Sequence, residues 1–245
     1  MAAKKISIQK DKLIDDFLSP VSKVTDITSI LCNTDGTTAI CNNDSNIILF
    51  AKNTDLKTDE AFKLNIYEIK RFIRLLNCID SDNVDLEVTS NTLNYKSDKL
   101  KFKYHLAEDA MVPITKISTT KIAALTFDCK FLITSDKIQE ILKFSSVVEN
   151  VNKLYFTVSA DTGVTAELTD QQLEQSDSIS VNVVSEYEGK EVSTPLPINL
   201  DIFRLISSIK NENILVKINT EIKVLMFEIQ IGNTTLKYII SSLVK

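Results

Sequence analysis

The chain has 245 residues, of which 44% are apolar and 25% charged, and its formal net charge is −5. The length fits one large domain or two of ordinary size, and the composition is normal for a globular protein. The acidic balance disfavours a simple nucleic-acid-binding protein, although a basic surface confined to one face is compatible with it. No apolar run approaches the roughly 20 residues of a membrane helix. The polar start MAAKKISIQKDK has no apolar signal core, so we expect a cytoplasmic protein.

Four segments, beginning near residues 10, 66, 136 and 200, carry apolar residues at the three- and four-residue spacing of an amphipathic helix. Asn65, Asn199 and either Thr134 or Ser135 stand where helix N-caps belong. Pro20 should kink or shorten the first helix. Period-two alternation predicts antiparallel strands between the helices, at residues 83–90, 99–106, 153–160, 178–185, 223–231 and 235–241.

The glycines all occur in turn-like contexts: TDGTT, ADTGVT, YEGKE and IGNTT. Glycine there supplies the positive φ that tight hairpins need. Glycines this far apart exclude a glycine-rich phosphate loop.

Strand, helix and several strands therefore follow one another four times. The stretch between the second and third helices is the longest, because it contains AEDAMVPITKISTTKIAA (residues 107–124), which has little amphipathic pattern. We interpret this stretch as a crossing between two domains of the same build. The predicted boundaries are 1–108 for the first domain, 109–124 for the linker and 125–245 for the second domain.

Positive charge lies opposite the apolar stripe of several predicted helices, at 100° per residue. Lys70, Arg71 and Arg74 do so on the second helix, Lys143 on the third and Arg204 on the fourth. Lys12 on the first helix shares its polar side with Asp15 and Asp16. Taken one helix at a time, solvation explains such residues. A cationic surface follows only if the four helices line a common face.

The residue types that carry catalysis or bind metals are sparse. His105 is the only histidine, and DSD at residues 80–82 is best explained as a polar turn. The four cysteines Cys32, Cys41, Cys78 and Cys129 lack the spacing of zinc ligands and are expected to be buried free thiols. We therefore expect no enzyme, no catalytic residue, no metal and no cofactor.

Several stretches of the sequence resemble one protein family. LITSDKIQEILKFSSVVENVNKLYFTVS (residues 132–159) and EYEGKEVSTPLPINLDIFRLI (residues 186–206) are similar to the DNA sliding clamps of T-even-type bacteriophages. DGTTAICNN (35–43) resembles their first hairpin, and FKYHLAEDAMVPI (102–114) their domain crossing. PINLDIF is also similar to the corresponding turn of proliferating cell nuclear antigen. The likeness covers nearly the whole chain.

This resemblance implies an α+β, two-domain DNA-clamp fold, with two helix-plus-antiparallel-strand units in each domain. It implies a homotrimeric ring that encircles duplex DNA without regard to sequence and tethers the replicative DNA polymerase, with a clamp-loader ATPase as a further partner. For a viral clamp the compartment would be the cytoplasm of the infected host. The residues expected to face DNA are Lys12, Lys70, Arg71, Arg74, Lys137, Lys143 and Arg204.

The resemblance also implies a groove on the outer face that holds a short apolar peptide of a partner, near the domain crossing and the C-terminal strand. The candidates to line this groove are Met111, Val112, Ile114, Ile239, Ile240 and Leu243. The alternative for Ile239 and Ile240 is that they close the core of the second domain.

Two other functions stay open at this point. A β-rich phage structural protein would share the strands and turns, but it would not need four helices with cationic outer faces. A monomeric processivity factor would have the same fold without closing a ring. An enzyme is a more distant third reading. Native mass separates the ring from the monomeric factor.

Overall fold

The computed structural model describes residues 4–115, 117–148, 151–169, 177–209 and 213–243. By their internal contacts, the residues divide into two units, each of which is described by itself. The first unit comprises Met1–Asn43, Leu49–Ile122 and Ile231–Thr235. The second comprises Asp44–Ile48, Ala123–Gln230 and Leu236–Lys245.

The first unit contains two antiparallel sheets. One sheet has the strand order β1-β6-β7-β8, with β1 (Lys4–Gln9), β6 (Asn83–Val88), β7 (Thr92–Lys96) and β8 (Lys101–His105). The other has the order β4-β3-β2-β5, with β2 (Ile27–Asn33), β3 (Gly36–Asn42), β4 (Ile48–Asn53) and β5 (Phe62–Tyr67). Burial alternates strictly along β6, so that Asp85 and Glu87 point away from the core. The predicted period of two is therefore confirmed here.

The turn between β2 and β3 shows why its glycine is needed. Gly36 has φ +131°, and a Cβ at this position would lie 2.4 Å from the backbone oxygen of Asn53. Any other residue would be strained in this conformation and would collide with backbone. The other three glycines also have positive φ, as the turn contexts predict.

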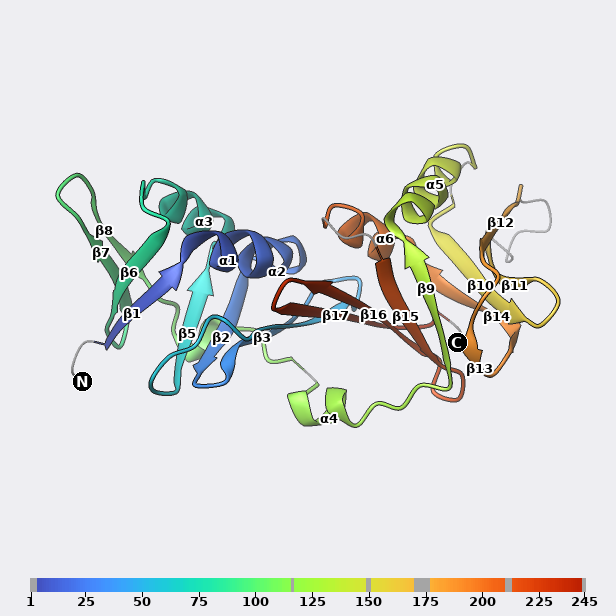
Figure 1. Ribbon diagram of the computed structural model, residues 1–245, viewed down its shortest axis with the longest axis horizontal. Coiled ribbons are helices and arrows are strands. Elements are labelled where there is room, and N and C mark those ends of the chain that lie inside the picture. Colours follow the sequence, from blue (N-terminus) through green and yellow to red (C-terminus); the bar gives the residue numbers. More distant parts are fainter. Residues whose placement is uncertain (1–3, 116, 149–150, 170–176, 210–212, 244–245) are drawn as a thin grey trace. The chain divides into compact units, whose positions relative to one another are not determined.

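The helices of the first unit lie side by side over its two sheets, as Figure 1 shows. The first helical segment runs without interruption through α1 (Lys10–Leu13), the π-helical turn η1 (Ile14–Leu18) and α2 (Ser19–Val24). Pro20 stands in the first turn of α2, directly after the π-helical turn, so the proline accompanies a distortion of the helix and does not end it. The second helix is α3 (Ile69–Asn77).

Asn65 corrects one prediction. It is not the N-cap of α3, because it lies within β5 and the helix begins only at Ile69 after Glu68 takes a left-handed conformation with φ 48°. The Asn65 amide nitrogen instead donates hydrogen bonds to the Ala107 backbone oxygen (3.2 Å) and to Asp109 Oδ1 (2.6 Å). Asn65 therefore ties the start of the crossing segment to β5. The crossing contains a 3-10 turn, η2 (Asp109–Met111), and a short helix, α4 (Thr119–Ala123).

The second unit repeats this build. One sheet has the order β13-β9-β15-β16-β17, with β9 (Cys129–Thr134), β13 (Glu188–Gly189), β15 (Asn213–Asn219), β16 (Val224–Ile231) and β17 (Thr234–Ser241). The other has the order β12-β11-β10-β14, with β10 (Lys153–Ser159), β11 (Gly163–Leu168), β12 (Ile179–Val184) and β14 (Val192–Asn199). Its helices are α5 (Ser135–Ser145) and α6 (Asp201–Ile206).

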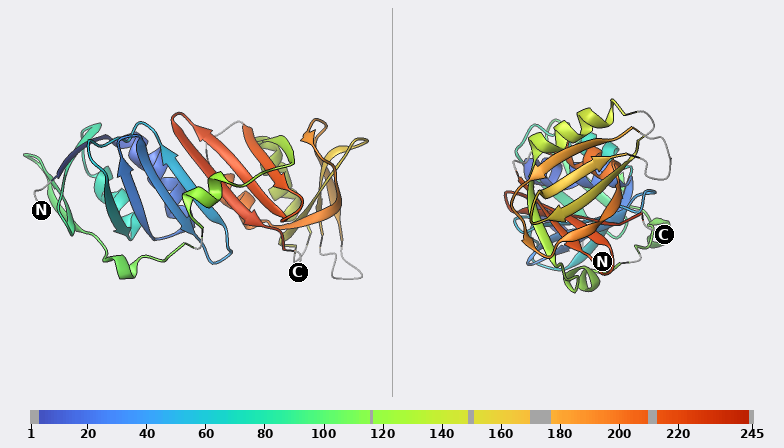
Figure 2. Two further views of the ribbon diagram at one scale, coloured as in Figure 1. Left: turned by 90° about the horizontal axis from the view of Figure 1, so that it is seen from below. Right: turned by 90° about the vertical axis from the view of Figure 1, so that its right-hand side faces the viewer.

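A row of phenylalanines connects the two sheets and α6 in the core of the second unit. Ring centroids lie 5.5 Å apart for Phe131 and Phe156, 6.3 Å for Phe156 and Phe203, and 5.7 Å for Phe203 and Phe227. All four side chains are buried. In the view from below in Figure 2, the strands lie in front of α1, α2 and α3 in the first unit and in front of α5 and α6 in the second, whereas the short α4 lies below the strands in Figure 1. In each unit, then, the helices other than α4 form a layer on one side and leave their outer face open.

Candidate nucleic-acid interface

The exposed face of α3 is the most cationic part of the helix layers. Ile69, Phe72 and Leu76 are buried and hold the helix on the core. The spacing of an α-helix then places Lys70, Arg71 and Arg74 on the opposite, exposed face, as the sequence predicts. The side chains of Lys70 and Arg71 are 64% and 54% exposed.

Two of these three cations have a carboxylate nearby. Arg71 Nη1 donates to Glu68 Oε2 at 2.8 Å, and this hydrogen bond raises the pKa of the guanidinium. Lys70 Nζ lies 4.0 Å from Asp26 Oδ1. Within the described ranges, Arg74 has no carboxylate within 4.0 Å of its guanidinium. The face therefore keeps an excess of positive charge, and Arg74 carries the most available part of it.

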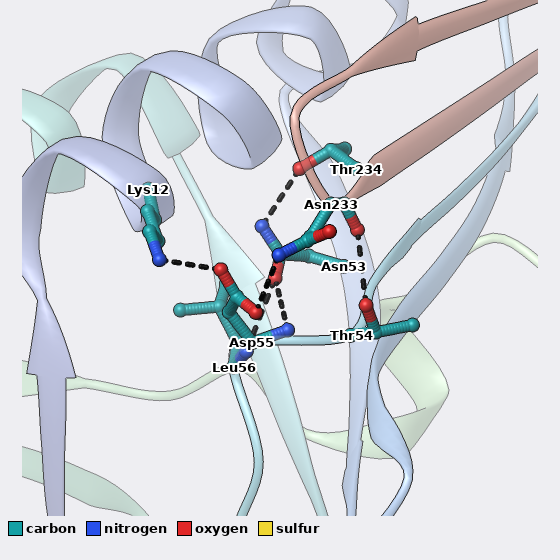
Figure 3. A network of polar contacts seen from close by, with 7 residues as sticks. All are labelled: Lys12, Asn53, Thr54, Asp55, Leu56, Asn233 and Thr234. Atoms are coloured by element: carbon teal, nitrogen blue, oxygen red, sulfur yellow. Dashed lines mark hydrogen bonds and ion pairs between the residues drawn. The ribbon is translucent and has the colours of Figure 1, made fainter.

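Lys12, one of the residues expected to face DNA, is paired with a carboxylate of the same unit. Its amine forms an ion pair with Asp55, which also accepts a 2.8 Å hydrogen bond from the amide of Asn233 (Figure 3). The hydrogen bonds from Lys12 and then Asn233 lower the pKa of Asp55. Lys12 thus ties α1 to the loop after β4 and is less available to a phosphate than a free lysine.

The same network extends to the Asn53 side chain, which bridges two parts of the first unit. Its amide nitrogen donates to Thr234 Oγ1 at 2.7 Å, and its oxygen accepts from the backbone nitrogens of Asp55 (2.8 Å) and Leu56 (3.1 Å). The Asn53 side chain is buried. The network therefore satisfies a buried amide and fixes the turn Ile231–Thr235 within this unit.

The first helical segment also carries acidic residues, as the sequence indicated. Asp15 is exposed and Asp16 is half-buried. Burial, and then the nearby charge of Asp15, raise the pKa of Asp16. These carboxylates weaken the positive potential of this segment, so α3 is the more cationic of the two helical segments in the first unit.

In the second unit, two of the three predicted cations are paired within their own helix. Lys137 lies 2.5 Å from Glu140, and Arg204 lies 2.6 Å from Asp201. Lys143 is exposed on α5 and has no ion pair in the part of the chain that the structure describes. Lys143 is exposed and the Arg204 side chain is 54% exposed, whereas the Lys137 side chain is only 26% exposed.

The caps that begin these helices agree only partly with prediction. Thr134 caps α5, because its hydroxyl accepts from the Lys137 backbone nitrogen at 3.2 Å. Asn199 lies one residue before the N-cap Leu200, and its side-chain oxygen accepts from the Asp201 backbone nitrogen at 2.9 Å. The two helices contact each other through Gln139, whose amide donates to the Ser207 backbone oxygen at 3.3 Å.

The residues proposed for a partner groove fall into two sets. In the first unit Met111 and Ile114 are 60% and 94% exposed, and Val112 is half-buried. In the second unit Leu243 is 46% exposed, whereas Ile239 and Ile240 are only 4% and 5% exposed. The burial of these two isoleucines corrects their assignment to an open groove and fits the alternative, in which they close the core of the second unit.

A groove that the sequence did not indicate lies in the second unit. It has a volume of about 620 Å³, and its apolar side chains include Leu132, Val184, Tyr187 and Leu215. The signal that could have found it is Leu132, an apolar residue at an outward position of β9 that is 53% exposed.

No cluster of three or more metal-ligating side chains occurs among the described residues. His105 is exposed at the end of β8. Burial raises the pKa of the thiols of Cys32, Cys41 and Cys129 to about 11, about 12 and about 11. Cys78 is exposed, which corrects the expectation that all four thiols are buried. Among the described residues, no helix is long and apolar enough to span a membrane.

The comparisons with solved structures identify the class of fold. The chain has the PCNA-like DNA clamp fold, an α+β architecture with antiparallel sheets, and this confirms the predicted fold class. No family model and no curated protein sequence matches the chain.

Three of the similar structures are clamps from different sources. The A. fulgidus PCNA bound to the C-terminal region of FEN-1 has a TM-score of 0.76 at 13% identity, covering 100% of this chain and 99% of that chain. The PCNA from Entamoeba histolytica has a TM-score of 0.73 at 15% identity, covering 100% of both chains. The PCNA2–PCNA3 complex from Sulfolobus tokodaii has a TM-score of 0.68 at 10% identity, covering 98% and 99%.

Proposed function

We propose that this protein is a DNA sliding clamp, a ring-shaped processivity factor that encircles duplex DNA and tethers the replicative DNA polymerase. The observation that carries this proposal is the clamp fold over the full chain together with the cations on the open face of the helix layers. The rival phage structural protein would need neither feature.

The proposed contacts with DNA are electrostatic and independent of sequence. Lys70, Arg71, Arg74, Lys143 and Arg204 offer positive groups to phosphates, and such contacts position a duplex without reading its bases. Because the contacts are few and several are shared with carboxylates, the duplex can slide. Exposed carboxylates on the outer face of the sheet, such as Asp85 and Glu87, disfavour binding on that side.

The proposed ring uses the free edges of two sheets. β8 ends one sheet in the first unit and β12 ends one in the second. Unpaired edge strands invite pairing with another chain. Pairing of β8 in one copy with β12 in the next is a heterologous contact, which generates a ring when the rotation closes. We infer a ring of three copies, in which every β8 edge pairs with the β12 edge of a neighbouring copy.

Native mass spectrometry at micromolar concentration tests ring closure directly. The expected mass is that of three copies of the chain. A strict monomer at every concentration contradicts the ring and favours a monomeric processivity factor with the same fold.

Topological retention on DNA tests the encirclement itself. The protein is placed on a nicked circular plasmid by the clamp-loader ATPase that we infer as a partner, and the plasmid is then cut once. We expect the protein to stay on the circle at salt concentrations that weaken phosphate contacts and to leave after cutting. Equal retention on circular and linear DNA contradicts a sliding ring.

A short apolar peptide of the polymerase or the loader is the proposed ligand of the crossing segment. The exposure of Met111 and Ile114, next to the half-buried Val112, supports this site. Alanine at all three positions should weaken binding of the polymerase C-terminal peptide in calorimetry. Leu31→Ala, which removes an apolar side chain that is 44% exposed elsewhere in the first unit, is the control. Wild-type affinity in a folded trimeric variant would contradict this site.

The similarity of residues 132–159 and 186–206 to T-even-type phage clamps supports a bacteriophage origin as a finer part of this proposal. The protein would then act in the cytoplasm of the infected host.

A further inference from the structure

The groove in the second unit is lined by both apolar and charged side chains. Leu132, Val184, Tyr187 and Leu215 contribute apolar surface, and the charged lining residues are Glu186, Glu188 and Lys130, of which Lys130 is the strand partner of Glu188. Its volume of about 620 Å³ lies within the range of about 300–1,000 Å³ that is usual for ligand pockets, so it can admit several side chains. Within the described residues, neither glutamate forms an ion pair.

One side of the groove is also a free strand edge. β13 pairs only with Cys129 and Lys130 of β9, so residues 131–134 have no neighbouring strand on that side among the described residues. Val184 is the last residue of β12, which is itself the edge of the other sheet. The groove therefore begins where the free edge of β12 ends.

The β7–β8 hairpin of the first unit is strongly basic. Its residues 96–103, KSDKLKFK, hold four lysines and one aspartate. Lys96 and Lys101 are directly opposite each other in the strand register, and both are exposed. Like charges placed opposite in a sheet are destabilising. An acidic surface from outside the hairpin would relieve this repulsion.

The tip of the hairpin has a defined shape and one apolar side chain. The Ser97 backbone nitrogen donates to the Leu100 backbone oxygen at 2.8 Å, and the Leu100 nitrogen donates to Ser97 Oγ at 3.1 Å. Leu100 is half-buried at this turn. Lys99 is paired only loosely with Asp80, at 3.6 Å with both side chains about 85% exposed.

Strand direction decides where this tip would lie on a second copy. Neighbouring strands in both units pair antiparallel, as β7 with β8 and β10 with β11 do. If β8 of one copy joins the free edge of β12 antiparallel, Lys101 at the start of β8 lies beside Val184 at the end of β12. The tip, residues 97–100, then extends past Val184 toward Glu186, Glu188 and the groove. A parallel pairing would place it at the other end of β12.

We propose that the groove receives the β7–β8 hairpin tip of a second copy, with Lys99 and Lys101 facing Glu186 and Glu188 and Leu100 against the apolar side chains that line the groove. This inference rests on the proposed ring and names what makes its contact specific. Complementary charge fixes register and rejects wrong partners more than it adds affinity. Each copy would then carry one acidic groove and one basic hairpin, and each hairpin would bind the groove of the next copy.

Charge reversal and its rescue test this pairing. Glu186→Lys with Glu188→Lys reverses the groove, and Lys99→Glu with Lys101→Glu reverses the hairpin. Each double variant should weaken trimer assembly by at least about tenfold in sedimentation or native mass measurements, because like charges then meet across the interface. The chain with all four substitutions should assemble like wild type, since its basic groove and acidic hairpin again have opposite charges.

Mixing the two double variants gives a sharper readout. One variant then has a basic groove and a basic hairpin, and the other has an acidic groove and an acidic hairpin. Opposite charges meet only between unlike variants, so the two variants must alternate around a ring. An odd ring of three cannot alternate, and the mixture should form mixed pairs but no closed trimer. Asp161→Lys with Glu221→Lys, and Lys57→Glu with Lys121→Glu, are the controls of equal charge change at other exposed positions. They should assemble normally, and circular dichroism checks that every variant is folded.

The outcomes separate this inference from the ring proposal. A wild-type chain that is always monomeric contradicts the ring, and the pairing with it. A wild-type trimer whose charge-reversed variants assemble unchanged contradicts the pairing alone. If the charge-reversed variants form trimers normally but no longer bind the polymerase, the polymerase and not a second copy occupies the groove. Failure of the fourfold variant to recover also counts against direct pairing.

Discussion

Replacing Lys70, Arg71 and Arg74 together by alanine is the most direct test of the DNA-facing surface. All three side chains lie on the open face of α3, while Ile69 and Phe72 on the other face hold the helix to the core. Alanine is the best helix former, so the helix should persist. Exposed substitutions of this kind usually change the free energy of unfolding by less than about 0.5 kcal/mol each.

The expected effect on DNA binding follows from the pairing of each cation. Each phosphate contact adds about 0.9 to the magnitude of the slope when the logarithm of the binding constant is plotted against the logarithm of the salt concentration. The affinity contributed by one contact therefore falls about 3.5-fold between about 50 and 200 mM salt. Arg74 lacks a carboxylate partner in the described ranges and should contribute fully. The triple variant should therefore lose about 0.9 of slope if Glu68 and Asp26 retain the other two cations, and about 2.7 if all three contact phosphates.

Fluorescence anisotropy of a labelled duplex, measured over a series of salt concentrations, gives this slope. Lys5→Ala, Lys57→Ala and Lys121→Ala form the matched control, because they remove three exposed lysines of the first unit outside α3. Glu68→Gln adds a test in the opposite direction. It frees the Arg71 guanidinium and should strengthen binding. A triple variant with the slope of wild type would refute the assignment of this face.

Three further outcomes are expected. The hydrogen bonds of Lys12 and Asn233 lower the pKa of Asp55 in the folded state. They therefore stabilise the fold at pH values above the pKa of this carboxyl in the unfolded chain, and this stability is lost as the pH falls through the pKa in the folded state. Asp55→Asn should therefore lower the urea midpoint at pH 7 and change it little below pH 3; an equal loss at both pH values would contradict the ion pair. At pH 8 iodoacetamide should add a single label, on Cys78, because the other thiols are buried with raised pKa values; rapid labelling of a second thiol in the mass spectrum would contradict this burial. Thr134→Ala should cost about 0.5–2 kcal/mol of unfolding free energy in a denaturant titration, by loss of the α5 cap; no change would show that the cap hydrogen bond contributes nothing.

The sequence by itself determined the local elements of this protein. Period-two alternation located strands such as β6 and β10, and three- and four-residue spacing located α3 and α5. Either Thr134 or Ser135 was expected to cap the third helix, and Thr134 does so, because its hydroxyl accepts a hydrogen bond from a backbone nitrogen only three residues away. The cations of α3 were assigned to its open face for the same reason, since a helix fixes the direction of each side chain from its neighbours alone.

Only the tertiary structure decided which distant residues meet. Lys12 is paired with Asp55, and Asp55 in turn with Asn233, which is 178 positions further along the chain. Asn65 binds the crossing segment and does not cap a helix. Leu132 became part of a groove because residues 184–188 pack beside β9. Periodicity reports contacts within a few residues, whereas these pairings depend on how the strands are ordered in each sheet, and no local pattern encodes that order.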